Sequence, residues 1–345
     1  MFYDDLNIPK IYKMKKALFS CLILVLFVIG CSKSTVNNTT NKPVQEYQKV
    51  SPDFDGDSAY HYVNKQVSFG PRVPNTKEHI ACGDYLVNQL KHFGADVLEQ
   101  KMTLTAFDGT KLNARNIIGT YGVDKKKRVL LFAHWDSRPF AEYDANKSRQ
   151  NEPILGANDG ASGVGVLLEI ARQINIKAPE IGVDIIFFDA EDYGAPYFAK
   201  DVPNGEWYCL GSQYWAENPH IKGYKANFGI LLDMVGAKNA TFYREGHSVY
   251  YAENVLEKVW ATARQLGYNK FFIGKDGSTS IDDHLYVNRG LNIPSIDIIH
   301  HDLNNDHSFG DFWHTHQDDM SIIDKETLKA VGQTILEVVY KEKGN

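Results

Sequence analysis

Four short, nearly continuous apolar runs constrain the fold of this 345-residue chain more than any other feature. They span residues 128–133, 183–189, 228–233 and 295–299. Runs of this length without alternation are typical of strands that are buried on both faces, as in parallel sheets. Helical patterns alternate with them, at residues 77–93, 163–175, 253–266 and 325–341. The alternation predicts an α/β fold, with a central mixed, largely parallel β-sheet flanked by helices.

Composition and charge narrow the function classes. Apolar residues make up 43% of the chain and charged residues 23%, a balance typical of a globular protein with a sizeable core. The formal net charge of −6 argues against a nucleic-acid binder, because such proteins usually carry a basic surface. No internal repeat or second linker divides residues 56–345, so we expect one catalytic domain there, acting as a monomer.

The first 55 residues have the character of a targeting segment followed by a tether. Two lysines precede the apolar run 17–29, which is too short for a comfortable transmembrane helix and is followed by Gly30 and Cys31. This end resembles a bacterial lipobox, which implies cleavage of residues 1–30 and attachment of lipid to Cys31. The alternative is a signal anchor that stays uncut. Residues 31–55 are largely polar and predict a flexible tether.

A lipoprotein signal predicts a periplasmic enzyme, anchored by lipid to a bacterial membrane. Ser32, directly after the lipid-bearing cysteine, favours the outer membrane over the inner one. Removal of residues 1–30 leaves Cys82 and Cys209 besides Cys31. This compartment permits disulfides, and the sequence leaves open whether Cys82 and Cys209 pair.

Polar side chains collect where three of the predicted strands end. His134 and Asp136 follow the first strand, Glu191 and Asp192 follow the second, and Asp233 closes the third. In open α/β sheets, ligands bind in the crevice outside the carboxyl ends of the strands. We therefore expect these side chains to face one crevice.

Three residues of these segments form a candidate metal site. Asp159 stands in the small-residue loop 156–163, Asp192 in the turn after the second strand, and His314 shortly before the last helix. Two carboxylates and an imidazole with one open position form the arrangement of a catalytic zinc. Each residue alone is more often a turn or surface residue, so the prediction depends on their order and their placement at strand ends.

Several motifs carry a resemblance to a known superfamily. Gly-Ala-Asn-Asp-Gly-Ala-Ser-Gly (156–163), Phe-Phe-Asp-Ala-Glu-Asp (187–192) and Trp-His-Thr (313–315) resemble the zinc aminopeptidase-like superfamily. The resemblance spans roughly residues 55–340. Within that superfamily, the flanking segments resemble the glutaminyl-peptide cyclotransferase family, above all Ala-His-Trp-Asp-Ser-Arg (133–138), Ile-Asp-Asp-His (281–284) and Phe-Gly-Asp-Phe-Trp-His-Thr (309–315).

The resemblance implies one zinc ion, held by Asp159, Asp192 and His314. It implies that Glu191 is the general acid and base. Asp192 departs from the animal enzymes of that family, which have glutamate there. Aspartate is shorter by one methylene but is still an ordinary zinc ligand.

The same resemblance implies the surroundings of that acid. Asp233 and Asp283 would form a buried carboxylate network beside Glu191. Trp313 and Phe309 would wall a narrow pocket for the substrate side chain. Neighbouring carboxylates would raise the pKa of Glu191 towards neutrality, as an acid–base catalyst needs.

The implied substrates are peptides or proteins with a free N-terminal glutamine. The α-amine attacks the γ-amide carbon of the same residue, pyroglutamate forms and ammonia leaves. Because the nucleophile is tethered, the enzyme chiefly has to hold the folded-back conformer. Zinc polarises the amide oxygen as a Lewis acid.

Two alternatives stay open at this point. A two-zinc aminopeptidase on the same scaffold would recruit His134 and Asp233 for a second ion, with Asp159 bridging and Glu191 activating a metal-bound water. Ligand counting does not separate this enzyme from the cyclase, because all of those residues are present. A lipoprotein that binds sugars or peptides without turnover is the second alternative, since fold alone would allow it.

Overall fold

The structure, a computed structural model, describes residues 47–344. The signal segment 1–30, the lipidation site Cys31 and most of the predicted tether lie outside the described residues. Residues 47–55 were expected in the tether, but they pack against the last helix. Phe54 is buried, and the Glu337 carboxylate accepts hydrogen bonds from the backbone N–H groups of Val50 and Ser51. The packed domain therefore includes these residues instead of beginning at residue 56.

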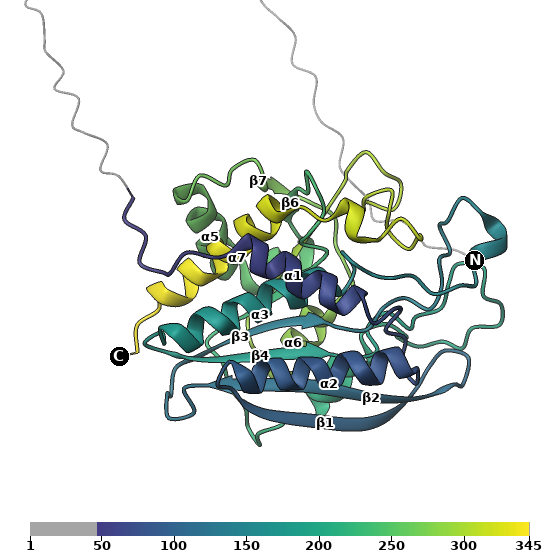
Figure 1. Ribbon diagram of the computed structural model, residues 1–345, viewed down its shortest axis with the longest axis horizontal. Helices are drawn as coiled ribbons and strands as arrows, with labels where there is room; N and C mark the ends of the chain where they lie inside the picture. The colour runs from purple at the N-terminus through teal and green to yellow at the C-terminus, as the bar shows by residue number, and fades with distance from the viewer. Residues whose placement is uncertain (1–46, 345) are drawn as a thin grey trace, which may run out of the picture. The chain divides into compact units, whose positions relative to one another are not determined.

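A six-stranded sheet in the order β1-β2-β4-β3-β5-β8 forms the centre of the domain (Figure 1). Its parallel part consists of the four strands that the apolar runs predict: β3 (Arg128–His134), β4 (Gly182–Phe188), β5 (Gly229–Asp233) and β8 (Ser295–Ile299). All residues of β4, β5 and β8 are buried, which explains why their sequences do not alternate. The predicted fold class is confirmed.

An antiparallel hairpin makes the sheet mixed. β1 (Asp96–Thr105) pairs with β2 (Lys111–Tyr121), and β2 pairs antiparallel with β4. β1 is the edge strand, and most of its side chains are exposed or half-buried. A separate pair of short parallel strands, β6 (Phe242–Arg244) and β7 (Phe272–Asp276), lies outside this sheet.

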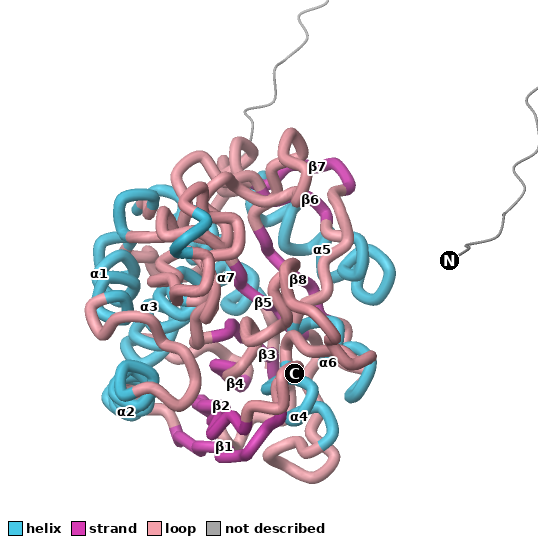
Figure 2. The backbone as a smooth tube through the Cα atoms, turned by 90° about the vertical axis from the view of Figure 1, so that its right-hand side faces the viewer, coloured by secondary structure: helices cyan, strands magenta, loops and turns pink. Residues whose placement is uncertain are grey.

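Helices cover both faces of the sheet (Figures 1 and 2). One side carries α1 (Gly56–Val67), α2 (Lys77–His92), α3 (Ala161–Ile176) and α7 (Lys325–Lys341). The other side carries α4 (Leu210–Glu217) and α6 (Asp283–Leu291), while α5 (Gly246–Gln265) packs against α7 and β8. Short 3₁₀ turns occupy Lys147–Arg149 and Met320–Ile322.

The predicted helices are found, and α5 differs most from its prediction. It begins at Gly246, seven residues before the predicted start, because the Glu245 carboxylate caps it by accepting from the backbone N–H groups of His247 and Ser248. Cys82 and Cys209, whose pairing the sequence left open, are both buried and free.

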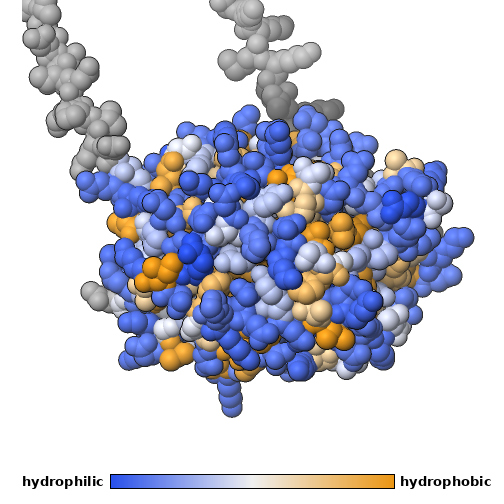
Figure 3. Space-filling view, in the orientation of Figure 1, coloured by the Kyte–Doolittle hydropathy of each residue, from blue (hydrophilic) through white to orange (hydrophobic). Residues whose placement is uncertain are grey.

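The face of the domain shown in Figure 3 is mostly hydrophilic, with scattered apolar spots. Single exposed apolar residues of this kind are normal for a folded protein. Between residues 47 and 344, we find no helix that combines the length and the apolar character needed to cross a membrane.

Candidate active site

The loops that follow the parallel strands gather at one end of the sheet, and Figure 2 views the domain from that end. β3 ends at His134 and β5 ends at Asp233. Glu191 and Asp192 stand in the turn after β4, and Asp159 lies just before α3. Each of these side chains is at least nine-tenths buried. The structure thus brings together the polar residues that the sequence placed after the strands.

Asp159, Asp192 and His314 form the predicted donor set. The His314 Nε2 atom lies 3.4 Å from Asp192 Oδ1 and 3.6 Å from Asp159 Oδ2. Zinc binds such atoms at about 2.0–2.2 Å, so ligands in a tetrahedral site are roughly 3.4 Å apart. Asp192 Oδ2 is buried and accepts no hydrogen bond from the described residues. The three side chains therefore fit a zinc ion in spacing and in chemistry.

Two buried carboxylates fix the loops that carry the acidic ligands. The Asp318 carboxylate accepts from the backbone N–H groups of Asn158 and Asp159, at 2.7 and 3.0 Å. The Asp136 carboxylate accepts from those of Glu191 and Asp192, both at 3.1 Å. Each loop is thus held by two adjacent backbone hydrogen bonds to one buried carboxyl group.

The imidazole ligand is held by an ion pair that the sequence did not reveal. The Nδ1 atom of His314 lies 3.1 Å from Glu142 Oε1, and the guanidinium of Arg138 donates to both oxygens of Glu142. Arg138 also donates to the backbone carbonyl of Asp192, at 2.8 Å. Burial alone would raise the pKa of Glu142, but His314 and Arg138 lower it to about 2. The charged carboxylate leaves Nε2 of His314 to face the other two ligands.

Gly160, the residue between Asp159 and α3, has a positive φ of 86°. A Cβ there would come within 2.6 Å of the Asp136 carbonyl oxygen and 2.9 Å of the His134 ring. The loop needs glycine here, because another residue would push the Asp159 loop away from the strand ends.

A second polar cluster adjoins the first. The Nε2 atom of His134 lies 3.0 Å from Asp159 Oδ1 and 3.2 Å from Asp233 Oδ1, and its Nδ1 atom lies 3.5 Å from Asp136 Oδ1. His134, Asp159 and Asp233 also bring donor atoms close enough to hold a metal ion. The distances around Nε2 are those of an N–H group shared by two carboxylates.

Glu191 stands beside the ligands among further buried acids. Burial raises the pKa of its carboxyl well above the usual range; the charge of His134 lowers it, and the charges of Asp192 and Asp282 raise it further. The Cys209 thiol donates to Glu191 Oε1 at 3.1 Å. The raised pKa makes this carboxylate a stronger base than an exposed glutamate, as a group that accepts and returns a proton requires.

Asp282 is a pocket residue that was not predicted from the sequence. It lines the pocket and lies near Glu191 and Cys209, whereas the predicted Asp283 is fully buried behind it at the start of α6. Burial and the charge of Asp233 raise the pKa of Asp282 to about 7. The sequence did offer one indication of Asp282, because it directly precedes the predicted Asp283 in an Asp-Asp pair.

A pocket of about 350 Å³ opens over these groups. Phe309 and Trp313 line it as predicted, with ring centroids 4.7 Å apart. Trp313 also stacks on the imidazole of His314, at 3.8 Å between centroids. The apolar wall is therefore in direct contact with the candidate metal ligands.

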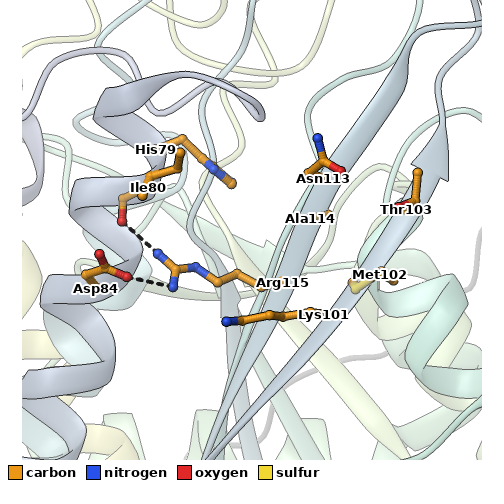
Figure 4. Close-up of a pocket in the computed structure, with 9 residues that line it drawn as sticks. All are labelled: His79, Ile80, Asp84, Lys101, Met102, Thr103, Asn113, Ala114 and Arg115. Atoms are coloured by element: carbon orange, nitrogen blue, oxygen red, sulfur yellow. Dashed lines mark hydrogen bonds and ion pairs between the residues drawn. The ribbon is translucent and has the colours of Figure 1, made fainter.

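A larger hollow of about 630 Å³ lies elsewhere, between α2 and the hairpin of β1 and β2. Figure 4 shows the Arg115 guanidinium at its centre, bonded to Asp84 and to the backbone carbonyl of Ile80. Arg115 also pairs with Glu99. Its donors are thus already engaged, and the hollow holds none of the predicted site residues.

The fold and the donor set define a zinc-dependent enzyme of the exopeptidase type. The model of peptidase family M28 matches residues 116–339. The chain therefore belongs to peptidase family M28, which confirms the superfamily that the motifs indicated.

Solved structures agree over nearly the whole domain. A zinc-dependent exopeptidase from Parabacteroides distasonis is 59% identical, with a TM-score of 0.84. The glutaminyl cyclase of Bacteroides thetaiotaomicron, bound to N-acetylhistamine, is 58% identical with a TM-score of 0.84, and that of Tannerella forsythia is 57% identical with 0.83. Each match covers 85% of this chain and 100% of the other.

Proposed function

We infer that this chain is a zinc-dependent glutaminyl-peptide cyclotransferase, which converts N-terminal glutamine to pyroglutamate and releases ammonia. The observation that carries this inference is the similarity to solved glutaminyl cyclases over the whole of their length. The donor set, the buried Glu191 and the narrow aromatic pocket support it, because the reaction needs a polarised amide, a proton carrier and a confined substrate.

Asp159, Asp192 and His314 would hold the zinc ion. When bound, zinc supplies a Lewis acid that polarises the γ-amide oxygen of the substrate. The Arg138–Glu142 pair would keep His314 directed at the ion, and Asp318 and Asp136 would keep the two aspartates in place.

Glu191 would carry the proton. The α-amine loses a proton as its nitrogen attacks the γ-carbon, and the departing amide nitrogen needs one to leave as ammonia. A single carboxyl beside both nitrogens serves as base and then as acid, provided that its pKa is raised. Burial and the neighbouring acids Asp192 and Asp282 raise the pKa of Glu191 in this way.

Trp313 and Phe309 would confine the substrate glutamine. The folded-back conformer places the α-amine against the γ-amide carbon. A pocket that holds this conformer supplies the ordering of the two groups, which would otherwise cost entropy during the reaction. Their rings line the pocket and would limit the access of water to the polarised amide. Exclusion of water favours cyclisation over hydrolysis.

We propose one zinc ion per chain. The His134 Nε2 atom is hydrogen-bonded to Asp233 at 3.2 Å, and a second ion would have to replace that hydrogen bond. His134, Asp159 and Asp233 favour the alternative function, a two-zinc aminopeptidase, because their donor atoms are grouped closely enough for a metal.

We also propose that the enzyme is a monomer, anchored through a lipid on Cys31 to the periplasmic face of a bacterial membrane, with the outer membrane as its site. The basic start, the apolar run 17–29 and Gly30-Cys31 support this proposal. Mass spectrometry of the mature N-terminus tests it: an acylated Cys31 is expected, and an intact residue 1–30 segment would contradict it.

The decisive experiment incubates the purified, zinc-loaded protein with a glutamine-starting peptide and, as the control, a leucine-starting peptide. We expect the first to lose one ammonia and the second to remain unchanged in mass spectrometry. Release of free amino acids from either peptide would identify an aminopeptidase. No change in either peptide would favour a binding lipoprotein. Zinc analysis of the same sample should give one ion per chain.

A further inference from the structure

Two exposed tyrosines continue the aromatic wall of the pocket outward. The ring of Tyr143 stacks on Trp313, with 5.1 Å between centroids and 27° between planes. The ring of Tyr197 lies 5.7 Å from Tyr143. Tyr143 is 42% exposed and Tyr197 is 63% exposed. We call these two rings the tyrosine shelf.

The shelf is fixed to the active-site loops. The backbone N–H of Tyr143 donates to the carbonyl of His314 at 3.2 Å, and its ring lies 5.3 Å from that of His307, which lines the pocket. Tyr197 follows the turn that carries Glu191 and Asp192 and packs against Phe198 at 5.5 Å. The ring of Tyr143 is therefore held in place by residues of the site itself, and the ring of Tyr197 by its contacts with Tyr143 and Phe198.

The segment 278–282, which also lines the pocket, is mostly polar but contributes one exposed apolar side chain. Ile281 lines the pocket and is 62% exposed, directly before Asp282. Two adjacent exposed rings at the opening of a pocket form an apolar patch, the kind of surface feature that marks ligand-binding grooves. The pocket itself, at about 350 Å³, has room for the reacting residue.

We propose that the tyrosine shelf binds the side chain of the residue that follows the N-terminal glutamine, so that the enzyme favours substrates with an aromatic second residue. This proposal rests on the proposed cyclotransferase function. The spacings from Trp313 to Tyr143 and from Tyr143 to Tyr197, 5.1 and 5.7 Å, each correspond to between one and two residues of an extended peptide, which advance about 3.3 Å each. An aromatic ring at position two would reach Tyr143 while the glutamine occupies the pocket.

The expected effect lies in substrate binding. The shelf is remote from the reacting atoms, so it contacts the ground state and the transition state equally. Such contacts lower KM and leave kcat nearly unchanged. One aromatic pair corresponds to a change of about 2- to 10-fold in KM.

The test uses two peptides of identical composition, Gln-Phe-Ala-Ala-Ala-Ala and Gln-Ala-Ala-Ala-Ala-Phe. The second places phenylalanine beyond the reach of the shelf. We expect kcat/KM to be about 2- to 10-fold higher for the first peptide, with the difference in KM. The readout is the ratio of the two kcat/KM values, which does not depend on the fraction of active enzyme.

Four variants locate the preference. Tyr143→Ala and Tyr197→Ala should bring the ratio towards one, whereas Tyr143→Phe, which keeps the ring, should retain it. Tyr250→Ala is the matched control, because Tyr250 is 79% exposed but belongs neither to the pocket nor to the shelf. A ratio of one in the unaltered enzyme, or a ratio that both alanine variants preserve, would overturn the proposal. Failure to cyclise either peptide would instead contradict the proposed function.

Discussion

Two of the hollows of this domain, the one beside α2 and the one at the strand ends, differ in size and in chemistry, and the smaller of these two has the features of an active site. The hollow beside α2 measures about 630 Å³, and its buried polar groups are paired: Arg115 with Asp84 and Glu99, and His79 with Asp189 at 2.9 Å. The pocket at the strand ends measures about 350 Å³, and it contains Asp192 Oδ2 without a hydrogen bond from the described residues. Incomplete pairing of buried groups, not volume, distinguishes the candidate active site.

Sheet topology explains the difference. In the parallel half, β3, β4 and β5 all end at the same edge, so the polar residues after them converge. In the antiparallel half, β1 and β2 end at opposite edges, and their charged side chains pair across the hairpin or with α2. Acidic side chains therefore lie together at the ends of the parallel strands. Around the antiparallel hairpin, the charged side chains form ion pairs instead.

The largest expected effect comes from removing the proton carrier. Glu191→Gln should lower kcat for glutamine cyclisation by about 10²- to 10⁴-fold, because glutamine cannot exchange a proton. Zinc content should stay at its original level, since Glu191 is not among the proposed ligands. Glu99→Gln, the same change beside the larger hollow, should alter kcat by less than about twofold. Equal losses of kcat in both variants would contradict the conclusion that only the pocket at the strand ends is catalytic.

The next effect concerns metal affinity. Glu142→Gln should raise the dissociation constant for zinc by about 10- to 100-fold, because His314 loses the charged partner that orients it. His314→Ala should lose the ion altogether. Competition with a chromophoric chelator measures both.

The matched control for Glu142 is Glu152→Gln. Glu152 lies 3.5 Å from His316, two residues along the chain from His314, and is half exposed. Its replacement should leave zinc affinity unchanged. If Glu142→Gln binds zinc as tightly as the unaltered protein, the ion pair with Arg138 has no part in holding the metal.

The buried acids give the zinc-free protein a characteristic pH dependence. Burial and nearby charges raise the pKa of Asp282 to about 7, and they raise that of Asp297 well above its usual value. The folded state then holds protons that the unfolded state releases, so the stability that these protons contribute is fully present below about pH 4. For Asp282 this stability is lost as the pH rises through about 7, and for Asp297 it is lost as the pH rises through that group's raised pKa. A pKa difference of one between the folded and unfolded states changes the free energy of unfolding by about 1.4 kcal/mol.

Denaturant unfolding of the zinc-free protein at pH 5 and pH 8 checks this expectation. Asp297→Asn should reduce the loss of stability between the two pH values, because asparagine does not ionise. Asp276→Asn, at an exposed position on β7, should leave the loss as it was. A loss that Asp297→Asn leaves unchanged would show that this carboxyl is not the source.

The sequence predicted the parallel half of the fold more completely than the antiparallel half. Strands buried on both faces are continuous apolar runs, so β3, β4, β5 and β8 were placed to within a residue. β1 is an edge strand with mostly exposed or half-buried side chains, including Leu98, and it carries no such signal. Burial on two faces, and not strand length, made the difference.

The site shows the same limit. Asp159, Asp192 and His314 were each predicted from a motif that is only a few residues long. Glu142 and Asp318 were not, because their roles arise from contacts across 172 and 159 residues with His314 and Asp159. A residue that acts by positioning another leaves no local pattern.

The smallest expected effect is the one that tests the larger hollow directly. Asp84→Asn removes one of the charged partners of Arg115, and because Asp84 is 62% exposed, the free energy of unfolding should fall by less than about 1 kcal/mol. Glutamine cyclisation should keep its kcat/KM to within about twofold. Thermal unfolding and the peptide assay check the two expectations. A large loss of activity would mean that the hollow beside α2 is linked to the catalytic pocket, and pairing of its charges would then no longer be a sufficient reason to set it aside.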